Sequence, residues 1–477
     1  MKKTGLFKII MFTLLGMIVA TYIFSGSYFE DGALTDLGMN YTGLFDAFSM
    51  FFKSFLIEYF AQTMLLVLAI GALYGVLEST GAYKKLVGKV VKELKGREFL
   101  FIVLVSLFIA ILTSAFDYGF ALFIFFPFII SVLLAMGYDK ISVGVATFGA
   151  TLVGIIGSTI GYNTSGVISK VLAIDTVENF YFKLALLLVC YVVLLLFLSK
   201  AKRTKVTDKQ LEEEDLFAEE HTSKKNTTTP ITVILILLFV LLILGCTNWS
   251  ETFKLEFFKN LHDKITGFSP KLPYLHITTK GFKVGTEKIA IFATLLGGIE
   301  ALGSWYYSEM AVLCFLSALL IGLIYKVNPF EGMMNGIKKT LKPAGMLFLS
   351  YVVLYFAANQ MFYQTLAELL LHLTSKFSVL ISSVVMMIAS FFHVDVLFVA
   401  NYAAPQMTQA TANTGLVALL TQSIYGVTMF IAPTSIYLTY GLTYLGIPYK
   451  EWVKKTWKLV LVLLAIVLAV LLIAKYL

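Results

Sequence analysis

The feature that most constrains the fold of this chain is a series of long apolar runs, two of which are interrupted by an aspartate. Asp117 and Asp395 each stand ten residues before a proline, Pro127 and Pro405 (127 − 117 and 405 − 395). The offset between the two pairs is 278 (395 − 117 and 405 − 127). A carboxylate inside hydrocarbon costs several kcal/mol unless it lines a cavity or has a partner. Such a repeat predicts a duplicated fold with one site between its halves.

The composition places the chain in a membrane. Hydrophobic residues make up 58% of it and charged residues 14%, whereas a soluble domain carries about a quarter charged residues. We therefore expect an all-α, multi-pass protein of the plasma membrane, of the bacterial inner membrane type, with lipid around it. The net charge of +8 comes mostly from short loops between the apolar runs, which is typical of loops that face the cytoplasm and does not indicate a nucleic acid partner. The basic N-terminus is predicted to be cytoplasmic.

Two pairs of short apolar segments predict re-entrant hairpins, at residues 99–135 and 377–407. The alternative for the first is two ordinary spans joined by a tight outer turn. Two further runs, 143–172 and 416–445, predict broken helices, since the first contains a glycine- and serine-rich stretch at 157–166 and the second contains Pro433. The competing interpretation is an intact helix whose Ser and Thr side chains bond back along it. Backbone breaks at membrane depth are tolerated where they line a cavity.

These segments order the chain into four parts. Residues 1–199 form the first repeat, 200–230 a charged cytoplasmic linker, 231–307 a connecting span with an external loop, and 308–477 the second repeat. The basic segment at 326–342 is expected to be a cytoplasmic loop, and the basic segment at 449–458 is expected to lie on the cytoplasmic side. The two halves enter the membrane from opposite sides, which defines an inverted repeat.

The hairpin tips and helix breaks of such a fold meet at mid-membrane, where they can hold a solute and a coupling ion. The predicted solute-binding residues are polar side chains at these places, together with one proline: Thr113, Ser114, Asn163, Thr164, Ser165, Gln422, Pro433, Thr434 and Ser435. Asp117 and Asp395 are predicted to hold Na⁺ or a proton, with helix capping as the alternative. A lone histidine, His393, offers too few ligands for a metal site, so no metal beyond a possible Na⁺ and no cofactor are expected.

The function predicted from these features is secondary active transport of a carboxylate, an amino acid or a short peptide, coupled to Na⁺ or H⁺. Signatures of phosphate-binding loops, zinc peptidases and nucleophile elbows are missing from the sequence, so we do not expect an enzyme. The alternatives are an uncoupled channel or permease of the same fold, and an intramembrane lipid-modifying enzyme in which the two aspartates and His393 act chemically.

Several motifs resemble those of the YfcC-like family of the ion transporter superfamily, which is related to p-aminobenzoyl-glutamate transporters and divalent-anion/sodium symporters. They are the stretches at residues 75–82, 92–99, 136–139 and 432–435, the pair Ser304-Trp305 with Glu309, and residues 445–452. The resemblance covers nearly the whole chain apart from the linker and the external loop. It implies a homodimer with a scaffold domain and an elevator-type transport domain.

The chain departs from that family at both tips. Where relatives carry Gly-Glu-Glu, this chain has Ala115-Phe116-Asp117, which keeps one acid. The family's Asn-Pro-Phe corresponds to Asn163-Thr164-Ser165, and its Ser-Gly-Ser-Gly-Gln corresponds to residues 395–399, which are acidic and apolar here. Asp117 is therefore the stronger candidate for a conserved coupling role, and Asp395 for whatever distinguishes this chain.

Overall fold

A computed structural model describes residues 5–30, 32–201, 203, 227–278, 281–373, 377–409 and 411–476. The charged linker predicted at 200–230 lies mostly outside these residues. Over the first part of the chain the elements are α1 (Leu6–Ala20), β1 (Gly26–Glu30), β2 (Ala33–Gly38), α2 (Leu44–Phe55), α3 (Glu58–Ser79), α4 (Ala82–Glu93), α5 (Glu98–Phe116), η1 (Ala121–Ile124), α6 (Phe126–Ala135), α7 (Lys140–Gly144), η2 (Val145–Gly149), α8 (Ala150–Ile156), η3 (Tyr162–Gly166), α9 (Val167–Val171) and α10 (Phe180–Leu198).

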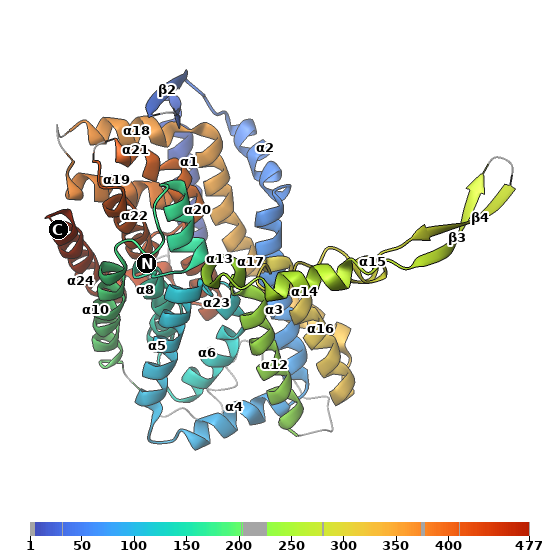
Figure 1. Cartoon of the computed structure of the whole chain (residues 1–477). Helices are drawn as coiled ribbons and strands as arrows, with labels where there is room; N and C mark the ends of the chain where they lie inside the picture. The colour runs from blue at the N-terminus through green and yellow to red at the C-terminus, as the bar shows by residue number, and fades with distance from the viewer. Residues whose placement is uncertain are drawn as a thin grey trace.

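The second part continues with α12 (Thr229–Cys246), α13 (Trp249–Phe253), α14 (Phe257–Thr266), β3 (Lys271–Thr278), β4 (Gly281–Lys288), α15 (Ile291–Leu296), α16 (Tyr307–Tyr325), α17 (Pro329–Gln360), α18 (Phe362–Leu371), α19 (Val379–Phe392), α20 (Val396–Tyr402), α21 (Ala404–Thr408), α22 (Thr414–Met429), α23 (Ile436–Leu445) and α24 (Tyr449–Tyr476). The chain is thus mostly helical, as predicted (Figure 1).

Seven helices of the described chain are long and apolar enough to cross a membrane: α3, α5, α10, α12, α16, α17 and α24. Each contains at least 18 residues, which is close to the length that spans the hydrocarbon core. Helices α3 and α17 are the most buried of the seven, whereas α12 and α24 keep most of their surface exposed, as lipid-facing helices do. The multi-pass membrane architecture follows from these spans.

A seam of small residues joins the two most buried spans. Gly71 and Gly75 of α3 face Gly332 and Gly336 of α17. A methyl group on Gly71, Gly75 or Gly336 would overlap atoms of the opposite helix, and one on Gly332 would be in tight contact with it at 3.0 Å. Two stretches of the form Gly-x-x-x-Gly therefore let the backbones approach closely, and van der Waals contact replaces the hydrophobic effect that is missing between helices in lipid. This seam fixes α3, which carries one wall of the site described below.

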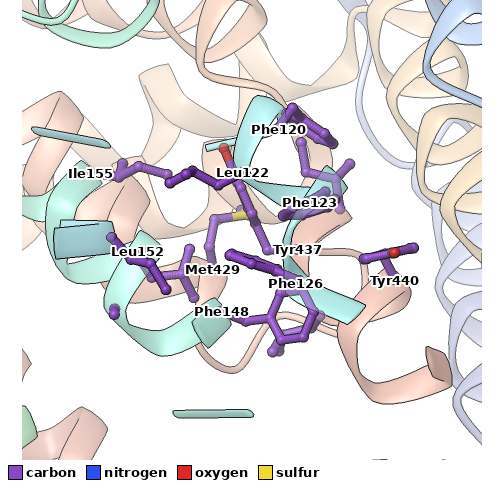
Figure 2. Packing of buried hydrophobic residues seen from close by; sticks show 14 of the residues in the cluster. Phe120, Leu122, Phe123, Phe126, Phe148, Leu152, Ile155, Met429, Tyr437 and Tyr440 are labelled. Carbon is purple, nitrogen blue, oxygen red and sulfur yellow. The ribbon is translucent and has the colours of Figure 1, made fainter. Parts of the chain in front are cut away.

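An aromatic core packs the segment after Asp117 against the second half of the chain (Figure 2). The Phe123 ring stacks on Tyr440 of α23 with centroids 4.7 Å apart, and Phe126 meets Phe148 edge to face at 5.0 Å. Edge-to-face and offset pairs of this kind contribute beyond their buried area. Because these rings come from η1, α6, η2 and α23, they tie distant parts of the sequence into one body.

The chain turns or breaks at four places that position the site. Helix α5 ends at Asp117, whose φ of 55° is left-handed, and α19 ends at His393 before Asp395 begins α20. Helical structure is also interrupted between α8 and η3, and between α22 and α23. Pro127 and Pro405 both lie in the first turn of a helix, α6 and α21, where a missing backbone N–H costs little. The two prolines therefore share a local structure, whereas the two aspartates do not: Asp117 follows the end of α5, and Asp395 caps the start of α20.

The segment predicted as a loop at 326–342 is mostly helical instead. Residues 329–342 form the first part of the 32-residue helix α17, and the basic segment 449–458 likewise forms the first part of α24. Asn328 caps α17 by accepting hydrogen bonds from Phe330 N and Glu331 N, and Pro329 follows at the first position. The lysines that suggested loops lie on polar ends of long helices, which extend beyond the apolar stretch.

Two β-hairpins lie outside the helical body. The strands β1 and β2 pair antiparallel and pack on α18, where Ser27 Oγ and Thr365 Oγ1 share a hydrogen bond of 2.8 Å. The strands β3 and β4 also pair antiparallel and extend away from the helices (Figure 1). The sequence predicts an external loop in this second region, and the structure places the β3–β4 hairpin there.

Candidate functional site

Asp117 and Asp395 line the same cavity. Its volume is about 110 Å³, and its walls come from helix ends and breaks far apart in the sequence. Of the predicted site residues, Thr113, Asn163 and Thr164 line it together with the two aspartates. The other lining residues are Tyr59, Tyr118, Gly119, Phe120, Ala121, Ile155, Val167, Cys246, Trp305, Tyr306, Tyr307, Met310, Val396, Leu397, Tyr425, Ile436 and Tyr437.

The Asp117 carboxylate lies at the start of the helical segment that follows the first break. Its Oδ2 accepts a hydrogen bond of 3.0 Å from the backbone N–H of Thr164. The carboxylate lies so close to Gly161 that a Cβ on that residue would overlap it, which explains a glycine at the break. Helix N-termini favour a negative charge, so this position stabilises Asp117 in its ionised form.

The Asp395 carboxylate has two partners. Its Oδ1 accepts 2.9 Å from the N–H of Leu397 and so caps α20, while its Oδ2 accepts 2.5 Å from the phenol O–H of Tyr59 on α3. The side chain is buried, with 6% of its surface exposed. Asp395 therefore caps a helix and also lines the cavity, two roles that the sequence analysis treated as alternatives.

Aromatic rings form much of the cavity wall. The rings of Tyr59 and Tyr307 are 5.6 Å apart, those of Tyr306 and Tyr307 4.7 Å, and those of Phe120 and Tyr437 5.3 Å. Tyr425 donates its O–H to Val394 O at 3.0 Å, which holds the chain beside Asp395. None of the residues that line this cavity is a lysine, arginine or histidine. The described wall is therefore acidic and aromatic.

The remaining predicted site residues lie around the cavity rather than on its wall. Ser114 Oγ donates to Gly157 O at 2.7 Å, and Gln422 Nε2 donates to Ser158 O at 2.9 Å, so both hold the first break. Thr434 Oγ1 donates to Phe391 O at 2.7 Å, and Ser435 Oγ accepts from Leu438 N at 3.3 Å, which caps α23. Pro433 faces a separate apolar groove.

Ser165 accepts from a residue that the sequence interpretation overlooked. Lys183 of α10 is buried, with 1% of its surface exposed, and its Nζ donates to Ser165 Oγ at 2.6 Å and to Thr176 O at 2.7 Å. A lysine within an apolar span is rare and marks a position with a structural or functional reason. Its hydrogen bond tethers η3, which carries Asn163 and Thr164, to α10.

His393 is fully buried and stacks on Tyr402 at 5.1 Å. It lies outside the cavity, and the described residues contain no group of three or more His, Cys, Asp or Glu side chains able to hold a metal. Neither ring nitrogen of His393 has a hydrogen-bond partner in the described part of the chain. Thr113 Oγ1 is also buried and without a partner among the described residues, but it lies at the cavity.

The fold and this site define a multi-pass membrane carrier. A family model for C4-dicarboxylate anaerobic carriers matches residues 5–476, and the chain belongs to this family, DcuC. The protein is therefore a transporter and not the intramembrane lipid-modifying enzyme considered as an alternative.

Comparison with solved structures finds a likeness along the whole chain. The crystal structure of the Alcanivorax borkumensis YdaH transporter is similar to the chain, with 13% sequence identity and a TM-score of 0.43. The similarity covers 98% of each chain. No curated protein sequence matches the chain.

Proposed function

We propose that the protein is a secondary active carrier whose solute and coupling cations meet in the cavity between Asp117 and Asp395. The observation that carries the proposal is that two carboxylates predicted from a repeated pattern line one cavity at the ends of interrupted helices. Carriers of the inverted-repeat kind bind solute and ion at such helix ends. The family description makes a C4-dicarboxylate the leading solute.

A dicarboxylate in this cavity needs compensating positive charge. The lining carries two carboxylates and no basic residue, so a dianion would face like charges in a region of low dielectric. Binding of Na⁺ or H⁺ at Asp117 and Asp395 removes that repulsion. Coupling of solute to cation then follows from electrostatics, because neither binds well alone.

The solute's own oxygens would be held by hydroxyl groups. Three helix N-termini near the site already have protein partners: Asp117 at η3, Asp395 at α20 and Ser435 at α23. A substrate carboxylate must therefore find other donors. Thr113 supplies a hydroxyl that has no partner in the described part of the chain, and Tyr437 of the wall supplies a phenol group. The phenol groups of Tyr59, Tyr118 and Tyr425 already have protein partners.

We further propose the inverted repeat, the elevator movement and membership of the YfcC-like branch. The two halves run in the same element order: α3 to α10 correspond to α17 to α24 at offsets of 278 up to the Pro positions and 270 afterwards (434 − 164). The surface helices α4 and α18 lie at opposite ends of the body in Figure 1, which supports opposite orientations. The hairpins at 99–135 and 377–407 and the broken helices at 143–172 and 416–445 would move together against α3, α16 and α17.

The proposed orientation places the N-terminus and α4 in the cytoplasm and the β3–β4 hairpin outside, with two copies forming a dimer. Exposed Lys85, Lys89 and Lys92 on α4 support the first point, since positive charge favours the cytoplasmic side. An impermeant thiol reagent added to intact cells should label a Lys283→Cys variant and leave Lys89→Cys unlabelled.

The test of function is uptake into proteoliposomes. Labelled succinate should accumulate when an inward Na⁺ or H⁺ gradient is imposed, and accumulation should stop when the gradient is collapsed. Equal uptake with and without a gradient would indicate an uncoupled permease instead.

A cationic amino acid is the second candidate solute, because paired carboxylates with aromatic faces also suit an organic ammonium group. Labelled arginine measured in the same vesicles separates the two candidates. Competition of arginine uptake by succinate, or the reverse, shows whether both use this cavity.

A further inference from the structure

An apolar groove separate from the aspartate cavity runs along the outside of the second half of the chain. Its volume is about 650 Å³, and it lies between α19, the end of α22 and the first half of α24. Phe391 and Phe392 at the end of α19, with Ala432 and Pro433 at the second break, close one side, and Trp457 and Leu461 of α24 form the other.

The groove is almost wholly apolar. Its two hydroxyl-bearing residues, Thr428 and Tyr449, donate to the backbone carbonyls of Ile424 and Ile431, which leaves the indole N–H of Trp457 as its remaining side-chain donor. Ile431 at the second break and Trp457 and Leu461 of α24 keep 38%, 46% and 53% of their surface exposed. A groove of this kind within a bilayer is filled by hydrocarbon, because acyl chains are the apolar groups that surround it.

A row of positive charge begins at the groove. Three groove residues of α24, four positions apart, are each followed directly by an exposed lysine. The pairs are Tyr449 and Lys450, Val453 and Lys454, and Trp457 and Lys458. The lysines therefore form a stripe next to the apolar stripe on the same helix. With Lys455, the segment 449–458 carries four lysines and one acidic residue, Glu451.

These lysines are available to an anion. No salt bridge joins any of the four to a carboxylate in the described chain, and Lys458 Nζ lies 5.5 Å from the centre of the Trp457 ring at the rim of the groove. Basic residues next to a groove between membrane helices attract anionic lipid headgroups. A second copy of the chain would bring the same positive stripe toward this one, which disfavours it as the occupant.

We propose that this groove is a binding site for an anionic phospholipid, with an acyl chain in the groove and the headgroup phosphate on Lys450, Lys454 and Lys458. Such a lipid would contact the end of α19 and the second helix break at once. Thr434 Oγ1 already joins these two elements through its bond to Phe391 O. The bound lipid therefore stabilises the arrangement of the second hairpin against its broken helix.

Trp457 provides the probe. Purified full-length protein is placed in phosphatidylcholine nanodiscs that contain a fixed fraction of acyl-brominated phosphatidylglycerol or, in a parallel sample, acyl-brominated phosphatidylcholine. Bromine quenches tryptophan fluorescence on contact, and the signal of Trp457 is the difference between the protein and its Trp457→Phe variant. We expect stronger quenching by the anionic lipid than by phosphatidylcholine. The ratio of the two should fall by about fivefold or more in the triple variant Lys450→Gln/Lys454→Gln/Lys458→Gln.

The matched control is Lys85→Gln/Lys92→Gln/Lys95→Gln, which removes the same charge from exposed positions at and beside α4 and should leave the preference unchanged. A Val453→Phe variant should reduce quenching by both lipids, because it fills the groove. Equal quenching by the two lipids, a preference that survives the first triple variant, or no quenching at all, as when a second copy covers the groove, would overturn the proposal. None of these readouts depends on transport.

Discussion

The phenol O–H of Tyr59 donates a 2.5 Å hydrogen bond to Oδ2 of Asp395, and this bond joins α3 to the tip between α19 and α20. Tyr59 belongs to a span fixed by the glycine seam with α17, whereas Asp395 belongs to an interrupted segment. A hydrogen bond to an ionised group contributes about 1.5–3 kcal/mol. The contact therefore holds the hairpin tip against the more rigid part of the molecule.

Replacing Tyr59 by Phe should weaken this conformation by about 1.5–3 kcal/mol, because the ring packing stays while the donor is lost. The measurement is a double-mutant cycle of thermal or denaturant stability with Tyr59→Phe and Asp395→Ala. Tyr355→Phe on α17 is the control. Its ring is half-buried, and its phenol group has no hydrogen-bond partner among the described residues. Strict additivity of the two changes would show that the bond contributes nothing.

Replacing Asp117 by Asn should abolish cation-coupled uptake while the protein stays folded. The amide oxygen can still accept from Thr164 N, so the break keeps its geometry, but the charge that attracts Na⁺ or H⁺ is gone. Uptake driven by a gradient in proteoliposomes and elution as a single species in detergent are the two readouts. Asp36→Asn, an exposed acid of β2 away from the cavity, should transport like the parent. Gradient-driven uptake by Asp117→Asn at the parental rate contradicts the assignment.

The sequence revealed the aspartates and missed the tyrosines for a physical reason. A carboxylate in an apolar run is costly and stands out at once, so Asp117 and Asp395 were identifiable. Tyr306 and Tyr307 lie at the start of an apolar span, where tyrosine is expected at any membrane interface, and nothing local shows that they face Asp395. Ser114, Gln422, Thr434 and Ser435 are predicted from the sequence to bind solute, whereas in the structure their side chains bond to backbone atoms around the cavity. Gln422 lies on the helix before the second break but donates to Ser158 O at the first, which sequence position alone does not indicate.

The extent of the helices shows the same limit. Basic residues at 326–342 suggested a loop because hydropathy marks only the apolar part of a helix, whereas Asn328 and Pro329 carry the signal for the true start of α17. The mostly helical, multi-pass fold, in contrast, was predictable from the apolar runs, whereas the inverted repeat stays a prediction that rests on the order of those runs and their interruptions. The pairing of Gly71 and Gly75 with Gly332 and Gly336 was not predicted, because Gly-x-x-x-Gly spacing does not indicate which helix each stretch contacts.

A larger side chain in the glycine seam should prevent folding. In Gly75→Val the new side chain would overlap the backbone of Gly332 and Gly336, so α3 and α17 must separate. Overpacking costs about 1–3 kcal/mol even where neighbouring side chains can adjust. The cost should be higher here, because the atoms that would be displaced belong to the backbone. We expect loss of the monodisperse peak in detergent. Gly345→Ala on the same helix α17 meets nothing within 4 Å and should leave stability unchanged or slightly raised, because alanine favours helix over glycine. Normal elution and stability of Gly75→Val would show that the two helices do not pack as described.

Replacing Lys183 by Met should lower stability and weaken apparent solute affinity together. The long apolar side chain fills the same space, but Ser165 Oγ and Thr176 O lose their donor, at a cost of about 1–3 kcal/mol for each buried group left unpaired. Because Ser165 follows Thr164 directly, loosening η3 also disturbs the cavity wall that Asn163 and Thr164 form. The measurements are the melting temperature and the KM of uptake. Lys170→Met, at an exposed position of α9, removes the same charge without a tether and should change neither. A fall in melting temperature with an unchanged KM would limit Lys183 to holding α10 in place, and unchanged values of both would contradict the tether itself.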